Sequence, residues 1–98
     1  MPEIKLPAIE TEIRVAKEMT AGNKIIYTVI KVSILKDEEG YIMGSWITPL
    51  AMLIIEPGRQ YALSITGEKM PLEMILELAP SLKSVVDKAR GIHKIKVT

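Results

Sequence analysis

Apolar and polar residues alternate along much of the chain before residue 67, a pattern typical of β-strands with one buried face. The clearest example is the segment 24–35. One of its faces carries Ile26, Thr28, Ile30, Val32 and Ile34, and the other carries Tyr27, Lys31 and Ser33. A looser alternation covers 12–19, and the residues Ala21-Gly22-Asn23 between the two segments tolerate a positive φ. The pattern therefore predicts two strands joined by a turn.

Further strands are predicted after the polar turn 37–40, whose final glycine favours an antiparallel return of the chain. The segments 41–48 and 50–55 are both extended. Pro49 between them marks a bulge, a strand start or a sheet edge, because proline cannot donate to the hydrogen-bond ladder. Glu56-Pro57-Gly58-Arg59 places proline and glycine at the central positions of a type II turn. That turn predicts a hairpin between 50–55 and 61–65.

After Gly67 the apolar period lengthens to that of a helix. The first helix has its core face at Leu72, Ile75, Leu76 and Ala79. It ends before Pro80, which we expect to begin a second helix. The second has its face at Leu82, Val85, Val86 and Ala89 and stops at Gly91. The last segment, 92–98, alternates again and is a candidate edge strand.

Strands followed by helices predict an α+β fold rather than a wound α/β fold. We expect an antiparallel β-sheet of about four to six strands, followed by two short C-terminal helices packed on one face. The length of 98 residues leaves room for a single domain, 1–98. Hydrophobic residues make up 48% of the chain and charged residues 26%, which is the balance of a globular core.

The net charge indicates which classes of partner to expect, and the N-terminal sequence indicates where in the cell the protein is expected. A net charge of +1 gives no strong field, so we expect no nucleic-acid partner. Zero cysteines exclude disulfides and thiolate metal sites. The N-terminus lacks the apolar core of a signal peptide, and the longest apolar run, 49–55, is far too short to span a bilayer. We expect a soluble, cytoplasmic protein with no membrane insertion. Scarce amide side chains (Asn23 and Gln60) beside abundant Ile, Lys and Glu are typical of thermophiles.

No residue pattern predicts catalytic, cofactor-binding or metal-binding chemistry. His93 is the single histidine and has no second ligand at helical spacing. The acidic turn 37–39 lacks the spacing of an EF-hand, and Glu73 and Glu77 are better explained as an exposed helical pair than as an acid/base pair. Nucleophile elbows and glycine-rich phosphate loops are absent from the sequence. Basic residues gather towards the C-terminus without stacking aromatics, which favours a solvated surface over an RNA site.

One family resemblance extends over most of the chain. The segment 47–55 with its Ile-Thr-Pro start, and the segment 72–80 with its Ile-Leu-Glu-Leu-Ala-Pro end, resemble the GerW (YtfJ-like) family of sporulation proteins. The segment 23–32 is similar to that family's strand after a turn. The glycine-rich insertion common before the Ile-Thr-Pro strand is reduced here to 40–44. The resemblance implies a non-enzymatic sporulation-family domain, and it transfers no catalytic residue because the family carries no established reaction.

Apolar side chains exceed what so thin a fold needs. Met74 and Leu78 widen the first helix beyond one stripe, and the strand 50–55 is apolar on both sides. Trp46 is either a core residue or an anchor at a subunit contact. We therefore expect self-association or protein binding, with a homodimer as the simplest assembly. The candidate interaction surface comprises Trp46, Thr48, Pro49, Arg59, Met74 and Leu78.

Two alternatives remain open. The first is a small apolar-ligand or lipid carrier with a pocket between sheet and helices. The methionines Met43, Met52, Met70 and Met74 are candidates for its lining, although core filling also explains them. The second is an enzyme with an unfamiliar polar site around Thr48 and Arg59.

Overall fold

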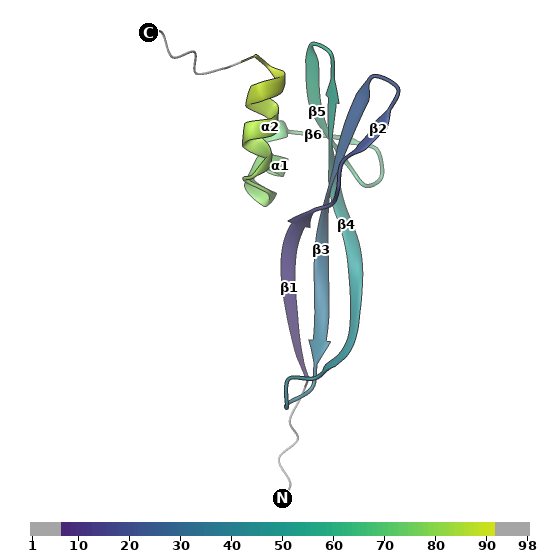
Figure 1. Cartoon of the computed structure of the whole chain (residues 1–98), viewed down its shortest axis with the longest axis vertical. Helices are drawn as coiled ribbons and strands as arrows, with labels where there is room; N and C mark the ends of the chain where they lie inside the picture. Colours follow the sequence, from purple (N-terminus) through teal and green to yellow (C-terminus); the bar gives the residue numbers. More distant parts are fainter. Residues whose placement is uncertain (1–6, 92–98) are drawn as a thin grey trace, which may run out of the picture.

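A computed structural model describes residues 7–91 of the chain. Its six strands form one antiparallel sheet in the order β1-β3-β4-β5-β6, and the short β2 also pairs with β3. Two helices follow the strands, so the predicted α+β fold is confirmed (Figure 1). The elements are β1 (Ala8–Val15), β2 (Met19–Ala21), β3 (Lys24–Lys36), β4 (Ile42–Glu56), β5 (Arg59–Ser64), β6 (Lys69–Met70), α1 (Leu72–Leu78) and α2 (Leu82–Ala89).

The turns lie where the sequence predicts them. Gly22 between β2 and β3 has φ of 64°, and Gly58 between β4 and β5 has φ of 75°, which is the region that a type II turn requires of its third residue. In the turn after β3, the Asp37 carboxylate accepts hydrogen bonds from the backbone N–H groups of Glu39 and Tyr41, at 2.9 and 2.8 Å. This acidic residue therefore shapes the hairpin.

The proline in β4 sits beside a bulge. Val29 of β3 pairs with Ala51, but Ile30 pairs with Pro49, so Leu50 has no partner on β3. Since β5 pairs only with Ala51–Glu56 of β4, Pro49 also lies on an open edge of the sheet. The prediction of a bulge or edge at Pro49 is confirmed, and the two predicted extended segments form one strand of 15 residues.

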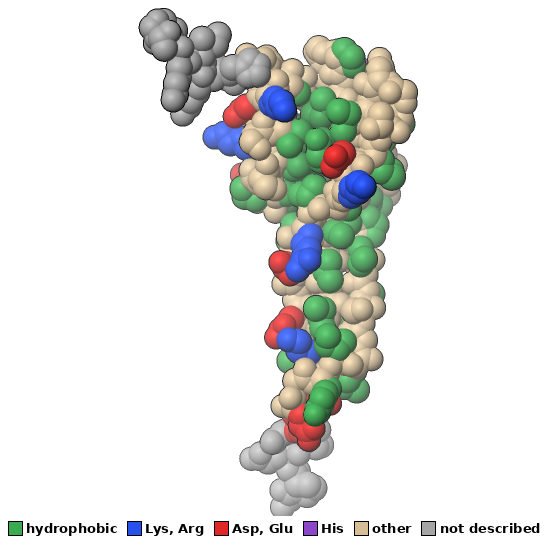
Figure 2. All heavy atoms as spheres, in the orientation of Figure 1, with side chains coloured by type: hydrophobic (Ala, Val, Ile, Leu, Met, Phe, Trp, Pro, Cys, Tyr) green, Lys and Arg blue, Asp and Glu red, His purple; other side chains and the backbone are tan. Residues whose placement is uncertain are grey.

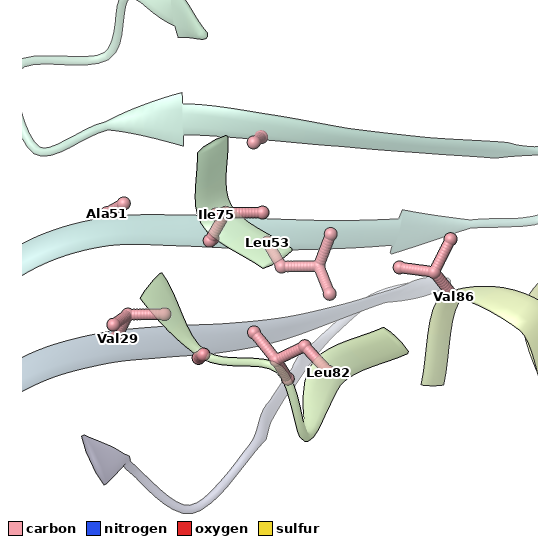
Figure 3. Packing of buried hydrophobic residues seen from close by; sticks show 8 residues of the cluster. Val29, Ala51, Leu53, Ile75, Leu82 and Val86 are labelled. Atoms are coloured by element: carbon pink, nitrogen blue, oxygen red, sulfur yellow. The ribbon is translucent and has the colours of Figure 1, made fainter. Parts of the chain in front are cut away.

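The helices pack on one face of the sheet, at one end of it. Small and branched side chains of β3, β4 and β5 meet the inner faces of α1 and α2 (Figure 3). This core comprises Val29, Ala51, Leu53, Ala62, Ile75, Ala79, Leu82 and Val86, each at most 5% exposed. The apolar faces predicted for the two helices are confirmed by Ile75, Leu82 and Val86, while Ala89 at the end of α2 is exposed.

Element boundaries differ from the predictions in three places. The first strand runs over Ala8–Val15 rather than 12–19, because the chain leaves the ladder at 16–18 before β2. Pro80 lies in a turn, and α2 begins two residues after it at Leu82. The two-residue strand β6 was not predicted, since two residues are too few to show alternation. The predicted strand 92–98 lies outside the described residues.

The molecule is long because its core occupies only one end. Its radius of gyration is 18.3 Å, whereas a compact chain of this length has roughly 13 Å. We call β1 together with residues 30–36 of β3 and 42–49 of β4 the blade; the rest of the sheet with both helices is the head. Figure 1 shows the blade projecting away from the helices. Within it, only Val15 packs against the helix-covered core.

Candidate interaction surface

The two faces of the blade follow from the strand register, because paired residues on antiparallel strands direct their side chains to the same side. One face continues the side that the helices cover in the head. We call it the helix-side face; its large apolar members are Ile9, Ile13, Leu35 and Trp46. The opposite side, which we call the open face, has an apolar strip on β3 and β4. Its members are Ile30, Val32, Ile34, Ile47 and Pro49.

Several large apolar side chains of the blade are exposed to solvent. Ile9, Trp46 and Ile47 have exposed fractions of 58%, 46% and 64%. No helix lies over either face of the blade in the part of the chain that the structure describes (Figure 1). Figure 2 shows hydrophobic side chains continuing from the head down the blade. The blade is therefore an apolar surface without an internal cover.

Charged residues border this surface on β1. Glu10, Glu12 and Arg14 lie opposite Ile34, Val32 and Ile30, so they share the open face. The Arg14 guanidinium lies 2.8 Å from Glu12, and Lys36 lies 3.0 Å from Glu10. These ion pairs are solvent-exposed and contribute little to the stability of the fold.

A second polar group lies on the open face at the far end of the head. The Tyr61 hydroxyl donates a 2.7 Å hydrogen bond to Glu56 Oε1, and Lys24 Nζ lies 3.2 Å from the same oxygen. The Arg59 guanidinium stacks 4.6 Å from the centroid of the Tyr61 ring. The hydrogen bond from Tyr61, followed by the Lys24 ammonium, lowers the pKa of Glu56. The same hydrogen bond raises the pKa of Tyr61, so this phenol is held in its protonated form.

The six residues predicted for the interaction surface lie in three places. Trp46 and Thr48 are on the helix-side face of the blade, and the adjacent Pro49 is on the open face. Arg59 begins β5 opposite Glu56, eight residues along β4 from Thr48, a separation of roughly 26 Å. The structure therefore does not form the polar site around Thr48 and Arg59. Met74 and Leu78 lie on α1, with exposed fractions of 51% and 38%.

Two sequence-based interpretations need correction. Trp46 is not a core residue, since it lies on an outer strand and is 46% exposed. The methionines do not line a pocket together: Met43 and Met74 are more than half exposed, at opposite parts of the molecule. The groove between sheet and helices is lined instead by Ile25, Tyr27, Ile55, Ser84, Val85, Lys88 and Ala89.

That groove lies on the helix-side face of the head. It has a volume of about 600 Å³, within the range of small-molecule sites, and it is open to solvent. Its floor comes from three residues of β3 and β4 and its wall from α2. Among the described residues 7–91, Lys88 is the one charged residue that lines it. The helical period alone could not reveal the groove, because it depends on how far α2 stands from the sheet.

Metal and membrane-spanning features are not found in residues 7–91. No group of three or more carboxylate or histidine side chains there is arranged to hold a metal ion. Neither α1 nor α2, the helices of this part of the chain, is long and apolar enough to cross a bilayer.

Comparison with family models, with curated proteins and with solved structures finds no match to this chain. The GerW resemblance therefore rests on its sequence motifs.

Proposed function

We propose that this chain is a non-enzymatic domain of the GerW-like type that acts by associating with a second copy of itself through the blade. The observation that carries the proposal is the blade's exposed apolar surface, to which Ile9, Trp46 and Ile47 contribute. Burying a fully exposed aliphatic side chain stabilises an assembly by about 1.5–3 kcal/mol, and a side chain that is already partly covered, such as Trp46, contributes correspondingly less. A two-fold dimer is the commonest way to do so.

One motif of the GerW resemblance supports this surface. The Ile-Thr-Pro triplet, 47–49, lies in the uncovered blade, and the Ile-Leu-Glu-Leu-Ala-Pro segment, 75–80, forms the second half of α1 and the turn after it. The triplet therefore lies outside the helix-covered core, whereas the second motif lies in the head and supplies Ile75 and Ala79 to that core. A sporulation role for this chain is part of the same proposal.

Light scattering across a concentration series tests the association. We expect a mass near twice the monomer's 10.9 kDa at tens of micromolar, falling towards the monomer on dilution. Ile13→Ser, on the blade, weakens the dimer because Ile13 is 40% exposed on the helix-side face. Ile65→Ser is the matched control, because Ile65 is 44% exposed but lies in the loop after β5. A wild-type chain that stays monomeric throughout contradicts the proposal.

The groove supports a second candidate, a carrier of an acyl chain with an anionic head group. Ile25, Ile55 and Val85 offer apolar walls for the chain, and Lys88 supplies a positive charge for a carboxylate. The positive charge of Lys88 matches a fatty acid better than a neutral lipid.

Native mass spectrometry of freshly purified protein, and titration with a fluorescent fatty acid, test this candidate. We expect retained mass and a dissociation constant that Lys88→Glu raises roughly tenfold. Lys83→Glu is the control, because Lys83 is also exposed on α2 but does not line the groove. Equal affinity of both variants, or no binding by the wild type, rules out the carrier function.

A further inference from the structure

The blade has two edges, and they differ in how well they accept another strand. The β4 edge carries Pro49, the Leu50 bulge and a second irregularity opposite Leu35/Lys36. Prolines and bulges are the devices that protect sheet edges from pairing. The β1 edge has none of these: its eight residues pair with β3 in unbroken register from Ala8 to Val15. The β1 edge is therefore the one whose regular backbone can pair with another strand.

The hydrogen bonds of β1 show which backbone groups are available. The N–H of Ala16 donates to the carbonyl of Thr28 at 2.9 Å. In an antiparallel ladder the bonded residues alternate, so the even-numbered residues of β1 bond to β3. The odd-numbered residues, among them Thr11, Ile13 and Val15, direct their N–H and C=O groups outwards. This row can pair with an extended strand that also presents alternate residues.

We propose that two copies join by antiparallel pairing of β1 with β1, with Ile13 on the two-fold axis opposite Ile13 of the second copy. This inference rests on the proposed self-association and specifies how it occurs. The outward groups of Ile13 then bond to each other, and those of Thr11 bond to those of Val15 in the second copy. Two three-stranded blades become one continuous sheet.

Charge complementarity selects this register. With Ile13 on the axis, Glu12 of each copy lies opposite Arg14 of the other, and the four charges alternate in sign on the open face. If Thr11 were on the axis, Glu10 would face Glu12 twice. If Glu12 were on the axis, two Glu12 carboxylates would face each other. Only the Ile13-centred register, among these three, has opposite charges at every charged pair within β1.

The same symmetry brings the two ends of the molecule together. The axis is perpendicular to the sheet, so both helix-side faces lie on one side of the combined sheet. Because the strands are antiparallel, the head of each copy lies beside the blade of the other. Met74 and Leu78, exposed on α1, then lie on the same side as the second copy's Trp46. These residues, which are separated within one chain, are then on one side of the combined sheet, while Ile47 and the rest of the open-face strip stay uncovered on the other side.

Charge reversal tests the register directly. Glu12→Arg and Arg14→Glu each place like charges opposite each other twice, and we expect each to raise the dimer dissociation constant at least roughly tenfold. The double variant E12R/R14E restores the opposite pairing, and we expect it to dimerise like the wild type. Recovery in the double variant is specific to the Ile13-centred register, since the Glu12-centred one would leave Glu10 facing a glutamate.

Glu10→Arg is the matched control, because in this register Glu10 faces Ala16 of the second copy. We expect little change in its dimerisation, whereas the Glu12-centred register predicts a loss. Circular dichroism checks that each variant is folded, and hydrogen exchange reports whether the Thr11 and Ile13 amides become protected at dimer concentrations.

If the wild type dimerises and both single variants do so equally well, β1 pairing is wrong while self-association stands. If the double variant is as weak as the singles, this register is wrong. A monomeric wild type overturns both proposals.

Discussion

Ser33 and Trp46 are paired on neighbouring strands, yet Ser33 is 2% exposed and Trp46 is 46% exposed. Ser33 lies on the central strand of the blade, between Thr11 of β1 and Trp46 of β4, and its small side chain is covered by larger neighbours. Within residues 7–91, no strand pairs with β4 on the far side of Trp46. At the scale of single residues, position in the sheet and size therefore decide exposure here more than polarity does. Residue type alone would favour an exposed serine and a largely buried tryptophan.

The polar contact between Tyr61 and Glu56 links one residue pair to the pH dependence of stability. The pKa of Glu56 is lowered from its ordinary 4.5. The ionised Glu56 carboxylate therefore stabilises the folded state fully above pH 4.5, and this stabilisation is lost as the pH falls through the lowered pKa. Tyr61→Phe removes the main cause of the shift. We expect the variant to have a lower free energy of unfolding than the wild type at pH 7, and a smaller difference at pH 3.

Urea denaturation at the two pH values measures this difference. Tyr27→Phe serves as the control, because among the described residues no carboxylate accepts a hydrogen bond from Tyr27, and its hydroxyl is not part of the Glu56 group. A Tyr61→Phe difference that is the same at pH 3 and pH 7 contradicts this account of the hydrogen bond.

At the scale of elements, α1 has two apolar faces with different surroundings. Ile75 is fully buried against the sheet, whereas Met74, its neighbour in sequence, is 51% exposed. The helical period predicts both positions as apolar but assigns only one of them to the core. The exposed one remains available for a contact outside the chain.

Alanine substitutions separate these two faces. Ile75→Ala leaves a cavity in the core, and we expect it to lower the free energy of unfolding by about 2–5 kcal/mol. Met74→Ala truncates a half-exposed side chain outside the core, and we expect less than about 0.5 kcal/mol. Chemical denaturation at a concentration where both variants are monomeric measures the two values. Equal losses would mean that α1 does not present the Ile75 face to the sheet.

Strand and turn positions could be predicted because they depend on local signals. The alternation of β3, the proline in β4 and the glycine of the type II turn each specify backbone geometry within a few residues. The side of the sheet that the helices cover could not be predicted from this alternation, because the more apolar face of β3, with Ile30, Val32 and Ile34, lies on the side opposite the helices. The bulge at Leu50 adds to this difficulty, since it changes which positions of β4 share a face.

At the scale of the whole molecule, element lengths explain the exposed blade. Helices of seven and eight residues are roughly 11–12 Å long, whereas a strand of 15 residues is roughly 50 Å long. The helices can therefore cover only one end of β4. The surplus of apolar side chains was visible in the sequence, but its place in the blade was not, because that depends on where the helices dock.

The proline and the bulge in β4 limit how many copies can join one sheet. A sheet that could add strands at both edges would recruit copies without limit and form a fibre. Here Pro49 and the Leu50 bulge interrupt one of the two edges. If copies pair through β1 alone, the β1 edge of each copy is occupied once a dimer has formed. The sheet therefore stops growing at two copies.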